Sequence, residues 1–162
     1  MPEPPWLDDR EARVWRAMIG VMQQLTAVLE RRLVQDAGLS GADYTLLVPL
    51  SEVPGGVLRA RDLGRMVGWE RSRISHQITR MQKRGLVARE ECSEDARGSM
   101  VQLTDAGRAA IVEAAPAHVA AVRRYFLDVL TDAELDLIGP ALERVLDRLP
   151  DNGDDRARGE RP

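Results

Sequence analysis

The residues best suited to chemistry lie in one segment, Glu70 to Arg84, whose side chains separate onto two faces at helical period. Ile74, Ile78 and Met81 form the apolar inward stripe. The opposite face carries hydroxyls, an imidazole and basic groups, which can meet base edges or phosphate oxygens, and an Arg fork fits guanine in the major groove. We therefore predict a DNA-contacting surface made of Arg71, Ser72, Arg73, Ser75, His76, Thr79, Arg80 and Lys83.

The charge around this segment supports the same interpretation. From Arg59 to Arg84 there are eight Arg or Lys residues against only Asp62 and Glu70, although the whole chain of 162 residues has a net charge of -3. A solvated surface helix is the alternative, but such helices usually balance Arg and Lys with Glu. Because the positive charge is concentrated where a binding motif needs it, the sequence favours nucleic acid as the partner.

A shorter helix is expected before this segment, over about residues 60–67, with Leu63 and Val67 buried. Gly68 follows it, at a position where a left-handed residue ends a helix at low cost. Trp69 can pack back as a hydrophobic staple, although Glu70 is a weaker N-cap than Ser, Thr, Asp or Asn. The order helix, tight turn, helix predicts a helix-turn-helix.

Two short strands are predicted after the second helix, over residues 86–91 and 99–103, joined by a charged loop. Such a hairpin is the wing of a winged helix-turn-helix. At its tip, Arg97 beside Gly98 can enter a narrow minor groove, where the negative potential is strongest, while Asp95 holds the guanidinium in place. The alternative is an ordinary charged loop tip.

The segment from Leu63 to Gly107 resembles the DNA-binding core of the MarR family of bacterial transcription regulators. The resemblance rests on the recognition-helix run GWERSRISHQITRMQKRGLV and on the more diagnostic wing run EDARGSMVQLTDAGR. In that family the Asp-x-Arg-Gly of the wing tip precedes a strand ending in Leu-Thr and a helix opening at Gly-Arg. The matching residues are Asp95, Arg97, Gly98, Leu103, Thr104, Gly107 and Arg108.

The resemblance implies a homodimer on a pseudo-palindromic operator in double-stranded DNA, with the helix of residues 70–84 in the major groove and Arg97 in the minor groove. It also implies repression by occlusion of a promoter, and release by a small aromatic or phenolic effector that shifts the spacing of the two recognition helices. Adaptable Met and stacking aromatic side chains could line such an effector pocket, although ordinary core packing is the alternative for each. These candidates are Trp15, Met18, Met22 and Tyr44.

Apolar stripes also run through helices predicted outside the motif. A first helix, capped by Asp8 or Asp9, is expected to reach about Gln35, and a second opens at Ser40. After the wing, Thr104 can cap a helix bent at Pro116, and Thr131 to Glu134 is a capping box for a last helix. The three long stripes are Val14, Met18, Val21, Leu25 and Val28; Ile111, Ala115, Val119, Val122, Phe126 and Val129; and Leu135, Ile138, Leu142, Val145 and Leu149.

These stripes exceed what a single winged-helix unit needs, so we expect a two-fold interface built from both chain ends, with intramolecular packing as the alternative. The expected organisation is an N-terminal dimerisation helix in residues 1–36, a DNA-binding domain in 37–104, C-terminal dimerisation helices in 105–149 and a disordered tail in 150–162. The fold class is therefore mainly α with a small β wing, in which dimerisation helices flank a winged helix-turn-helix core.

Length and composition agree with one domain-sized unit. The hydrophobic content of 44% suffices for a core, and the small number of aromatic residues predicts an aliphatic one. No apolar run is long enough to span a membrane, and the start Met-Pro-Glu-Pro-Pro does not resemble a signal peptide, so a soluble cytoplasmic protein is expected. The single Cys fits a reducing compartment.

Other kinds of site and function are less favoured by the residues. Acidic neighbours should raise the pKa of Cys92, which disfavours redox sensing, and His118 is expected to be structural. With two His and one Cys far apart in sequence we expect no metal site, no cofactor and, because catalytic spacings are missing, no enzyme. The remaining rival is a winged-helix protein-interaction module without operator specificity, whose basic face docks an acidic partner.

The wing interpretation generates a first prediction. Arg97→Ala should weaken DNA binding without unfolding the protein, because an exposed loop-tip guanidinium contributes charge at the minor groove and little to the core. Fluorescence anisotropy with a DNA duplex measures the binding, and a thermal melt of the same sample checks the fold. Wild-type affinity in the variant would contradict the wing assignment.

Overall fold

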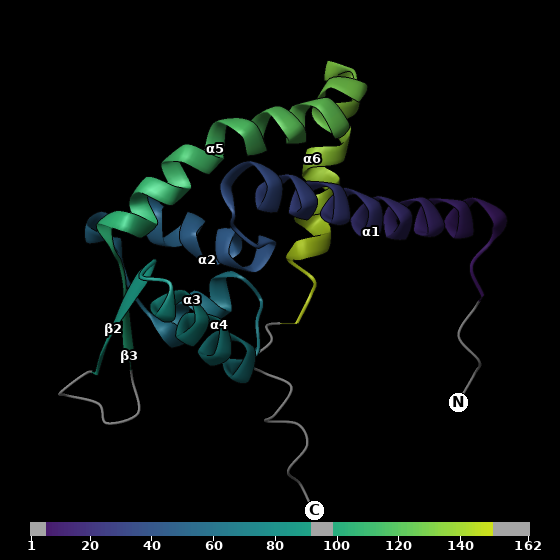
Figure 1. Ribbon diagram of the computed structural model, residues 1–162. Helices are drawn as coiled ribbons and strands as arrows, with labels where there is room; N and C mark the ends of the chain where they lie inside the picture. Colours follow the sequence, from purple (N-terminus) through teal and green to yellow (C-terminus); the bar gives the residue numbers. More distant parts are fainter. Residues whose placement is uncertain (1–5, 92–98, 151–162) are drawn as a thin grey trace, which may run out of the picture.

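The computed structural model describes residues 6–91 and 99–150, with Glu91 described by its backbone alone (Figure 1). Within these residues helices predominate and a small antiparallel sheet projects from them, which confirms the predicted mainly α class with a β wing. The elements are α1 (Asp9–Ala37), α2 (Gly41–Glu52), η1 (Pro54–Gly56), β1 (Val57–Arg59), α3 (Ala60–Met66), α4 (Arg71–Lys83), β2 (Val87–Glu91), β3 (Ser99–Leu103), α5 (Asp105–Tyr125), η2 (Leu127–Val129) and α6 (Asp132–Leu146).

Side-chain caps begin four of the helices at the positions that the sequence predicts. Asp8 accepts hydrogen bonds from the first backbone N–H groups of α1, and Ser40 accepts one from Asp43 N at 3.1 Å. Thr104 begins α5 and Thr131 begins α6 in the same way. Each cap satisfies an N–H group that a helix leaves without an intrahelical partner, which is why short polar residues mark these boundaries.

The helix-turn-helix consists of α3, a tight turn and α4. Gly68 adopts φ 66°, the left-handed conformation that the turn requires. Trp69 then packs, partly buried, against the core, and its backbone N–H donates to the Gly64 carbonyl at 2.9 Å. On α4, Ile74 and Ile78 are each 2% exposed and Met81 is 0% exposed, so the predicted inward stripe is confirmed.

The sheet has the strand order β1-β3-β2 and is antiparallel throughout. Strands β2 and β3 are the predicted hairpin, with Val87 opposite Leu103. Strand β1 was not predicted from the sequence, and it pairs with β3 so that Leu58 lies opposite Val101. A segment of three residues is too short to show an alternating pattern, and only the exposed edge of β3 makes it a strand.

One aliphatic core joins α2, α3, α4, the sheet and the start of α5, as the composition predicts. Gly107 allows α5 to begin directly against the hairpin, because a Cβ atom at this position would lie 2.0 Å from the Leu86 carbonyl oxygen. The hydroxyl of Thr104 donates to the same oxygen at 3.0 Å. The first turn of α5 and the start of β2 are thus held together by a contact that a larger residue would prevent.

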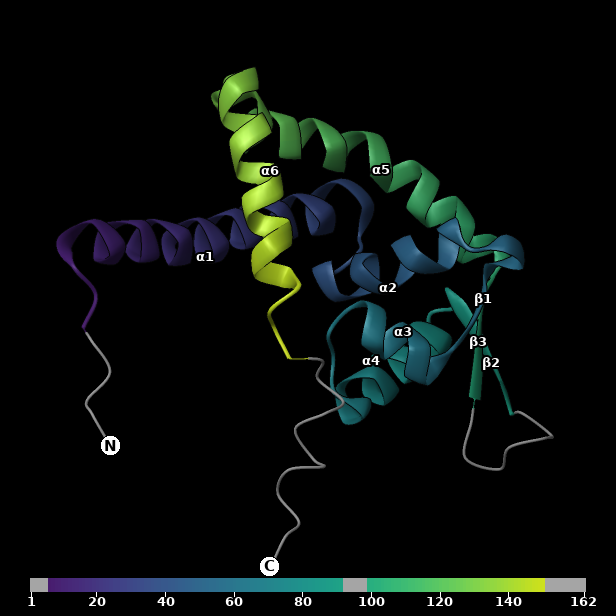
Figure 2. The ribbon, with the colours of Figure 1, turned by 180° about the vertical axis from the view of Figure 1, so that it is seen from behind.

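Figures 1 and 2 show α5 lying over α2 and the C-terminal part of α1, while the N-terminal half of α1 extends beyond the other helices. In α1 only Leu33 is buried, and α6 has no buried residue. Among the described residues, no helix combines the length and apolar character needed to cross a membrane. Because so few residues of α1 and α6 are buried, the apolar stripes of these two terminal helices remain largely uncovered in the single chain.

One detail of the predicted C-terminal helices was wrong. Helix α5 ends at Tyr125, so Val129 lies in η2 and does not continue the stripe. The buried residues of α5 include Ala114 and Ala121, while Val119 of the predicted stripe is 54% exposed in the single chain. Small alanine side chains allow α5 to approach its neighbours closely, which favours burying that side of the helix and leaves branched side chains outside.

The burial of α4 generates a stability prediction. Ile78→Ala should lower the free energy of unfolding by about 2 to 5 kcal/mol, because it removes buried methyl groups and leaves a cavity in the core. Met66→Ala is the control, since Met66 is 57% exposed and its truncation should change stability by less than about 0.5 kcal/mol. Urea denaturation followed by circular dichroism compares them, and equal midpoints would contradict the assigned helix phase.

Candidate nucleic-acid interface

The outer side of α4 presents a continuous polar and basic surface. All eight residues predicted for it are exposed, while the opposite side of the helix is buried. We call this surface the α4 polar face. It consists of Arg71, Ser72, Arg73, Ser75, His76, Thr79, Arg80 and Lys83. Hydroxyl, imidazole, guanidinium and ammonium groups therefore stand together on one rigid helix, where they can donate to phosphates and base edges at once.

Neighbouring groups orient several side chains of this face. The Arg73 guanidinium lies 3.9 Å from the centre of the Trp69 ring, a cation-π contact that directs it beside the turn. The Thr79 hydroxyl donates to the Ser75 carbonyl at 2.9 Å. Arg80 donates through Nε and Nη2 to the Gln77 side-chain oxygen. These contacts restrict rotamers before any ligand arrives, which lowers the entropy lost on binding.

Part of the local positive charge is used within the protein. Asp62 lies 3.5 Å from the Arg61 Nε and 3.8 Å from an Arg65 nitrogen, in exposed ion pairs on α3. Arg84, at the end of α4, pairs with Asp43 of α2. Three of the cations counted in the sequence therefore have acidic partners within the protein, and the basic side chains of the α4 polar face are the relevant group.

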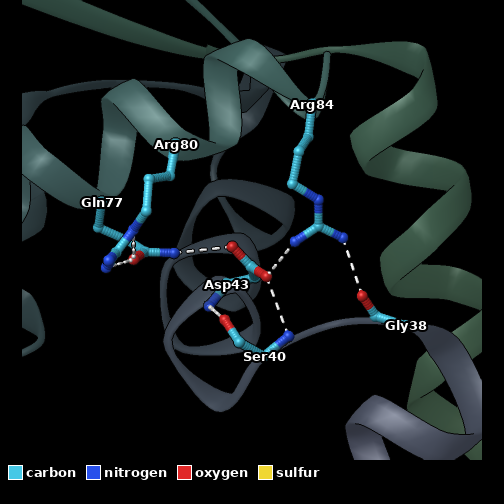
Figure 3. A network of polar contacts seen from close by, with 6 residues as sticks. All are labelled: Gly38, Ser40, Asp43, Gln77, Arg80 and Arg84. Atoms are coloured by element: carbon cyan, nitrogen blue, oxygen red, sulfur yellow. Dashed lines mark hydrogen bonds and ion pairs between the residues drawn. The ribbon is translucent and has the colours of Figure 1, made fainter.

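A buried polar pair that was not predicted from the sequence lies behind this face. Asp43 and Gln77 are each 2% exposed, and the Gln77 amide nitrogen donates to the Asp43 carboxylate at 2.7 Å (Figure 3). Both positions could have been found from periodicity. Gln77 is in phase with Ile74, Ile78 and Met81, and Asp43 has the same relation to the buried stripe Leu46, Leu47 and Leu50.

The wing tip is the second predicted part of the interface. Cys92, Asp95 and Arg97 lie outside the described residues, so their roles stay predictions. The strands that lead to and from this loop are described, and Figure 1 shows them projecting from the helical body on the same side as α3 and α4.

The residues predicted for an effector pocket have different surroundings. Trp15 and Met22 of α1 are 52% and 57% exposed, and Met18 is half-buried. Tyr44 packs against the core, with its ring centre 4.3 Å from that of His118. An open hollow of about 480 Å³ lies elsewhere along α1, and none of the four residues lines it. Its lining is Ala17, Gly20, Val21, Gln24, Leu25, Val28 and Tyr125.

His118 joins α5 to α2 through its contact with Tyr44. Its Nδ1 atom is buried and makes no hydrogen bond within the described part of the chain. Burial lowers the pKa of His118 below its ordinary value of 6.5 and raises the pKa of Tyr44. The neutral imidazole is thus the form that this packing favours, in agreement with the structural role expected for His118.

Comparison with known proteins identifies the group to which this fold and surface belong. A model of the MarR family matches residues 37–98. Sco3205, a MarR family transcriptional regulator from Streptomyces coelicolor solved in complex with DNA, is 39% identical, with a TM-score of 0.86 over 91% of this chain and 92% of that one. The chain belongs to the MarR family.

Two further solved structures are similar to this chain. AbsC, a MarR family transcriptional regulator from Streptomyces coelicolor, is 39% identical over 97% of this chain and 100% of its own, with a TM-score of 0.82. PcaV, a transcriptional regulator from the same organism solved with its natural ligand, is 25% identical over 90% of this chain and 99% of its own, with a TM-score of 0.70. The similarity to these transcriptional regulators therefore includes the terminal helices as well as the winged helix-turn-helix.

The buried imidazole generates a pH prediction for this MarR-family protein. Because the pKa of His118 is lower in the folded than in the unfolded state, the unfolded chain binds the proton more readily. The stability that this difference contributes is present above the ordinary pKa of 6.5 and is lost as the pH falls through the folded value.

His118→Phe removes the titration while keeping a ring beside Tyr44. Between about pH 7.5 and about pH 5.5, the wild-type midpoint in urea should fall more steeply than that of the variant. The comparison isolates His118 because all other titrating groups are common to both proteins. Parallel pH profiles would show that the packing does not disfavour the imidazolium.

Proposed function

We propose that this MarR-family protein is a sequence-specific DNA-binding transcriptional regulator that reads a pseudo-palindromic operator as a homodimer. The observation that carries the proposal is the α4 polar face, an exposed set of basic and hydrogen-bonding groups on a helix whose other side is buried in the core. The basic groups supply salt-dependent affinity for phosphates, and Ser72, Arg73, Ser75, His76 and Thr79 discriminate among bases. The DNA complex of Sco3205, a relative of 39% identity, supports this assignment.

The homodimer in this proposal is supported by uncovered apolar residues on the terminal helices. On α1, Val14, Val21 and Met22 are 64%, 49% and 57% exposed. On and after α6, five more apolar side chains are exposed, and exposed apolar surface of this kind supports a protein interface here. They are Leu137, Leu142, Val145, Leu146 and Leu149. A two-fold axis through these helices would repeat α4 about one helical turn of DNA away, roughly 34 Å, and so requires an inverted repeat.

The regulation that we propose is repression by promoter occlusion, relieved by a small aromatic or phenolic effector. PcaV, which is 25% identical, was solved with a natural ligand, and this supports ligand response as a property to test here. The ligand would act by favouring a dimer in which the two α4 helices no longer match adjacent major grooves. Salicylate and 4-hydroxybenzoate are suitable first probes, and a fall in operator affinity at saturating probe is the expected result.

The test of DNA reading is a fluorescence-anisotropy titration of the protein against the intergenic DNA upstream of its own gene and against a scrambled duplex, at two salt concentrations. We expect preferential binding to the upstream duplex that weakens as salt rises, because bound phosphates release counterions. Sedimentation of the same sample should show a dimer. Equal or absent binding to both duplexes would contradict the proposal and favour a protein-interaction module.

Single substitutions separate phosphate contact from base reading. Lys83→Ala should weaken binding to both duplexes and reduce the slope of log affinity against log salt by about 1, as expected for one lost phosphate contact. His76→Ala should instead reduce mainly the preference for the upstream duplex. Arg144→Ala is the charge-matched control for Lys83→Ala, because Arg144 lies on α6 and donates to the Pro140 carbonyl. An equal effect of Arg144→Ala would contradict the role of α4.

A further inference from the structure

We propose that Asp43 and Arg84 form a positioning pair for DNA recognition, which fixes the recognition helix α4 to the ends of α1 and α2 and orients Arg80 on the DNA face. The proposal rests on the proposed function, and it deepens it by assigning a role to residues that do not belong to the α4 polar face. Figure 3 shows the six residues of this network, which are contributed by α2, α4 and the segments just beyond α1 and α4.

The centre of the network is a buried carboxylate with polar partners on every side. Asp43 Oδ2 accepts from the Ser40 N–H at 2.9 Å and from Arg84 Nη1 at 2.5 Å, while Oδ1 accepts from the Gln77 amide at 2.7 Å. Its side chain is 3% exposed. Loss of Arg84 would leave the buried carboxylate with an uncompensated charge, and loss of either neutral donor would leave a buried acceptor unsatisfied, so the three partners must keep their relative positions.

Arg84 connects this centre to the end of α1. While Nη1 binds Asp43, Nη2 donates to the Gly38 carbonyl at 2.8 Å. Gly38 is the left-handed residue that ends α1, and its own N–H donates back to carbonyls of the last turn of that helix. One planar guanidinium therefore joins the end of the proposed dimerisation helix, the start of α2 and the end of α4, and its two donor directions are fixed by its geometry.

Gln77 carries the same constraint to the DNA face. Its amide nitrogen must face Asp43, because a carboxylate only accepts hydrogen bonds, and the amide oxygen is therefore directed toward Arg80. That oxygen accepts from Arg80 through Nε and Nη2. A continuous chain of contacts thus links a buried carboxylate in α2 to an exposed guanidinium of the α4 polar face.

A role in positioning explains this arrangement better than a contribution to stability. Aliphatic residues at Asp43 and Gln77 would simply extend the buried stripes of α2 and α4, and apolar replacements of buried ion pairs are often neutral or stabilising. Aliphatic contacts, however, allow a helix to slide or rotate slightly. Directional hydrogen bonds restrict both movements, and base reading needs that restriction because donors and acceptors must meet base edges in register.

The test uses the full-length protein and two variants that act on the pair differently. Arg84→Lys keeps the net charge but has one ammonium group in place of a fork, so it cannot hold Asp43 and Gly38 in the same geometry. Asp43→Asn keeps the shape and removes one negative charge. Asp128→Asn is the matched control, because Asp128 forms an exposed ion pair with Arg123 at 3.3 Å, outside the network.

Wild-type protein is first used to select duplexes from a random library, and each variant is then titrated with the selected duplex and its scrambled counterpart. We expect Arg84→Lys and Asp43→Asn to bind the selected duplex about tenfold more weakly, the scale of one lost base-pair contact, with little change for the scrambled duplex. Asp128→Asn should keep the wild-type ratio. The sign of the affinity change for Asp43→Asn distinguishes two effects. Removal of negative charge alone would tighten binding to both duplexes, whereas loss of positioning weakens binding to the selected duplex.

Circular dichroism and sedimentation establish that each variant is folded and has the wild-type oligomeric state, and Arg84→Lys carries the test if Asp43→Asn does not fold. If folded variants keep the wild-type preference, or lose affinity for both duplexes equally, the positioning role is overturned and the proposed function stands. If wild-type protein selects no sequence, the proposed function itself fails, and the positioning role fails with it.

Discussion

Ile74, Ile78 and Met81 bury one side of α4 in the aliphatic core, and this single packing contact turns every group of the α4 polar face outward. A helix of this length has little stability of its own, so its position depends on the elements that cover its apolar side. Helices α2 and α3 and strand β2 supply that cover, and the turn at Gly68 sets how α3 leads into it. The proposed reading of DNA therefore depends on an interior contact that touches no DNA.

The hydrogen bonds among Asp43, Gln77 and Arg84 restrict the orientation of α4 within this packing. Apolar contacts set how closely α4 approaches α2, whereas the Asp43 carboxylate distinguishes among rotations that would bury similar apolar area. The two kinds of contact have different effects because hydrophobic burial is not directional, whereas hydrogen bonds have preferred distances and angles. The network also links the end of α4 to both N-terminal helices, because Arg84 contacts the residue that ends α1 as well as Asp43 of α2.

The surface of the terminal helices differs from the α4 polar face, because it includes many exposed apolar side chains. Helices α1 and α6 leave apolar side chains uncovered, while α2, α3 and α4 bury theirs in the core, which also takes in Leu33 of α1 and Ile111 of α5. In this chain the terminal helices thus expose much of their apolar surface. In the proposed homodimer, the second copy covers them, and the spacing of the two α4 helices follows from that interface. In the proposed homodimer, a ligand would need to change the spacing of the two α4 helices only slightly to release DNA.

The sequence by itself determined the local structure, because its signals are local. Capping residues such as Ser40 and Thr104 marked helix starts, the stripe of α4 defined its buried side, and the wing run indicated the hairpin and the family. Only the tertiary structure revealed β1, which exists through its pairing with β3, and the end of α5 at Tyr125. It also decided that Asp43 meets Gln77 and Arg84, 34 and 41 residues away. Periodicity can predict that Asp43 and Gln77 turn inward, but their meeting with each other and with Arg84 depends on how two helices pack, which local sequence does not encode.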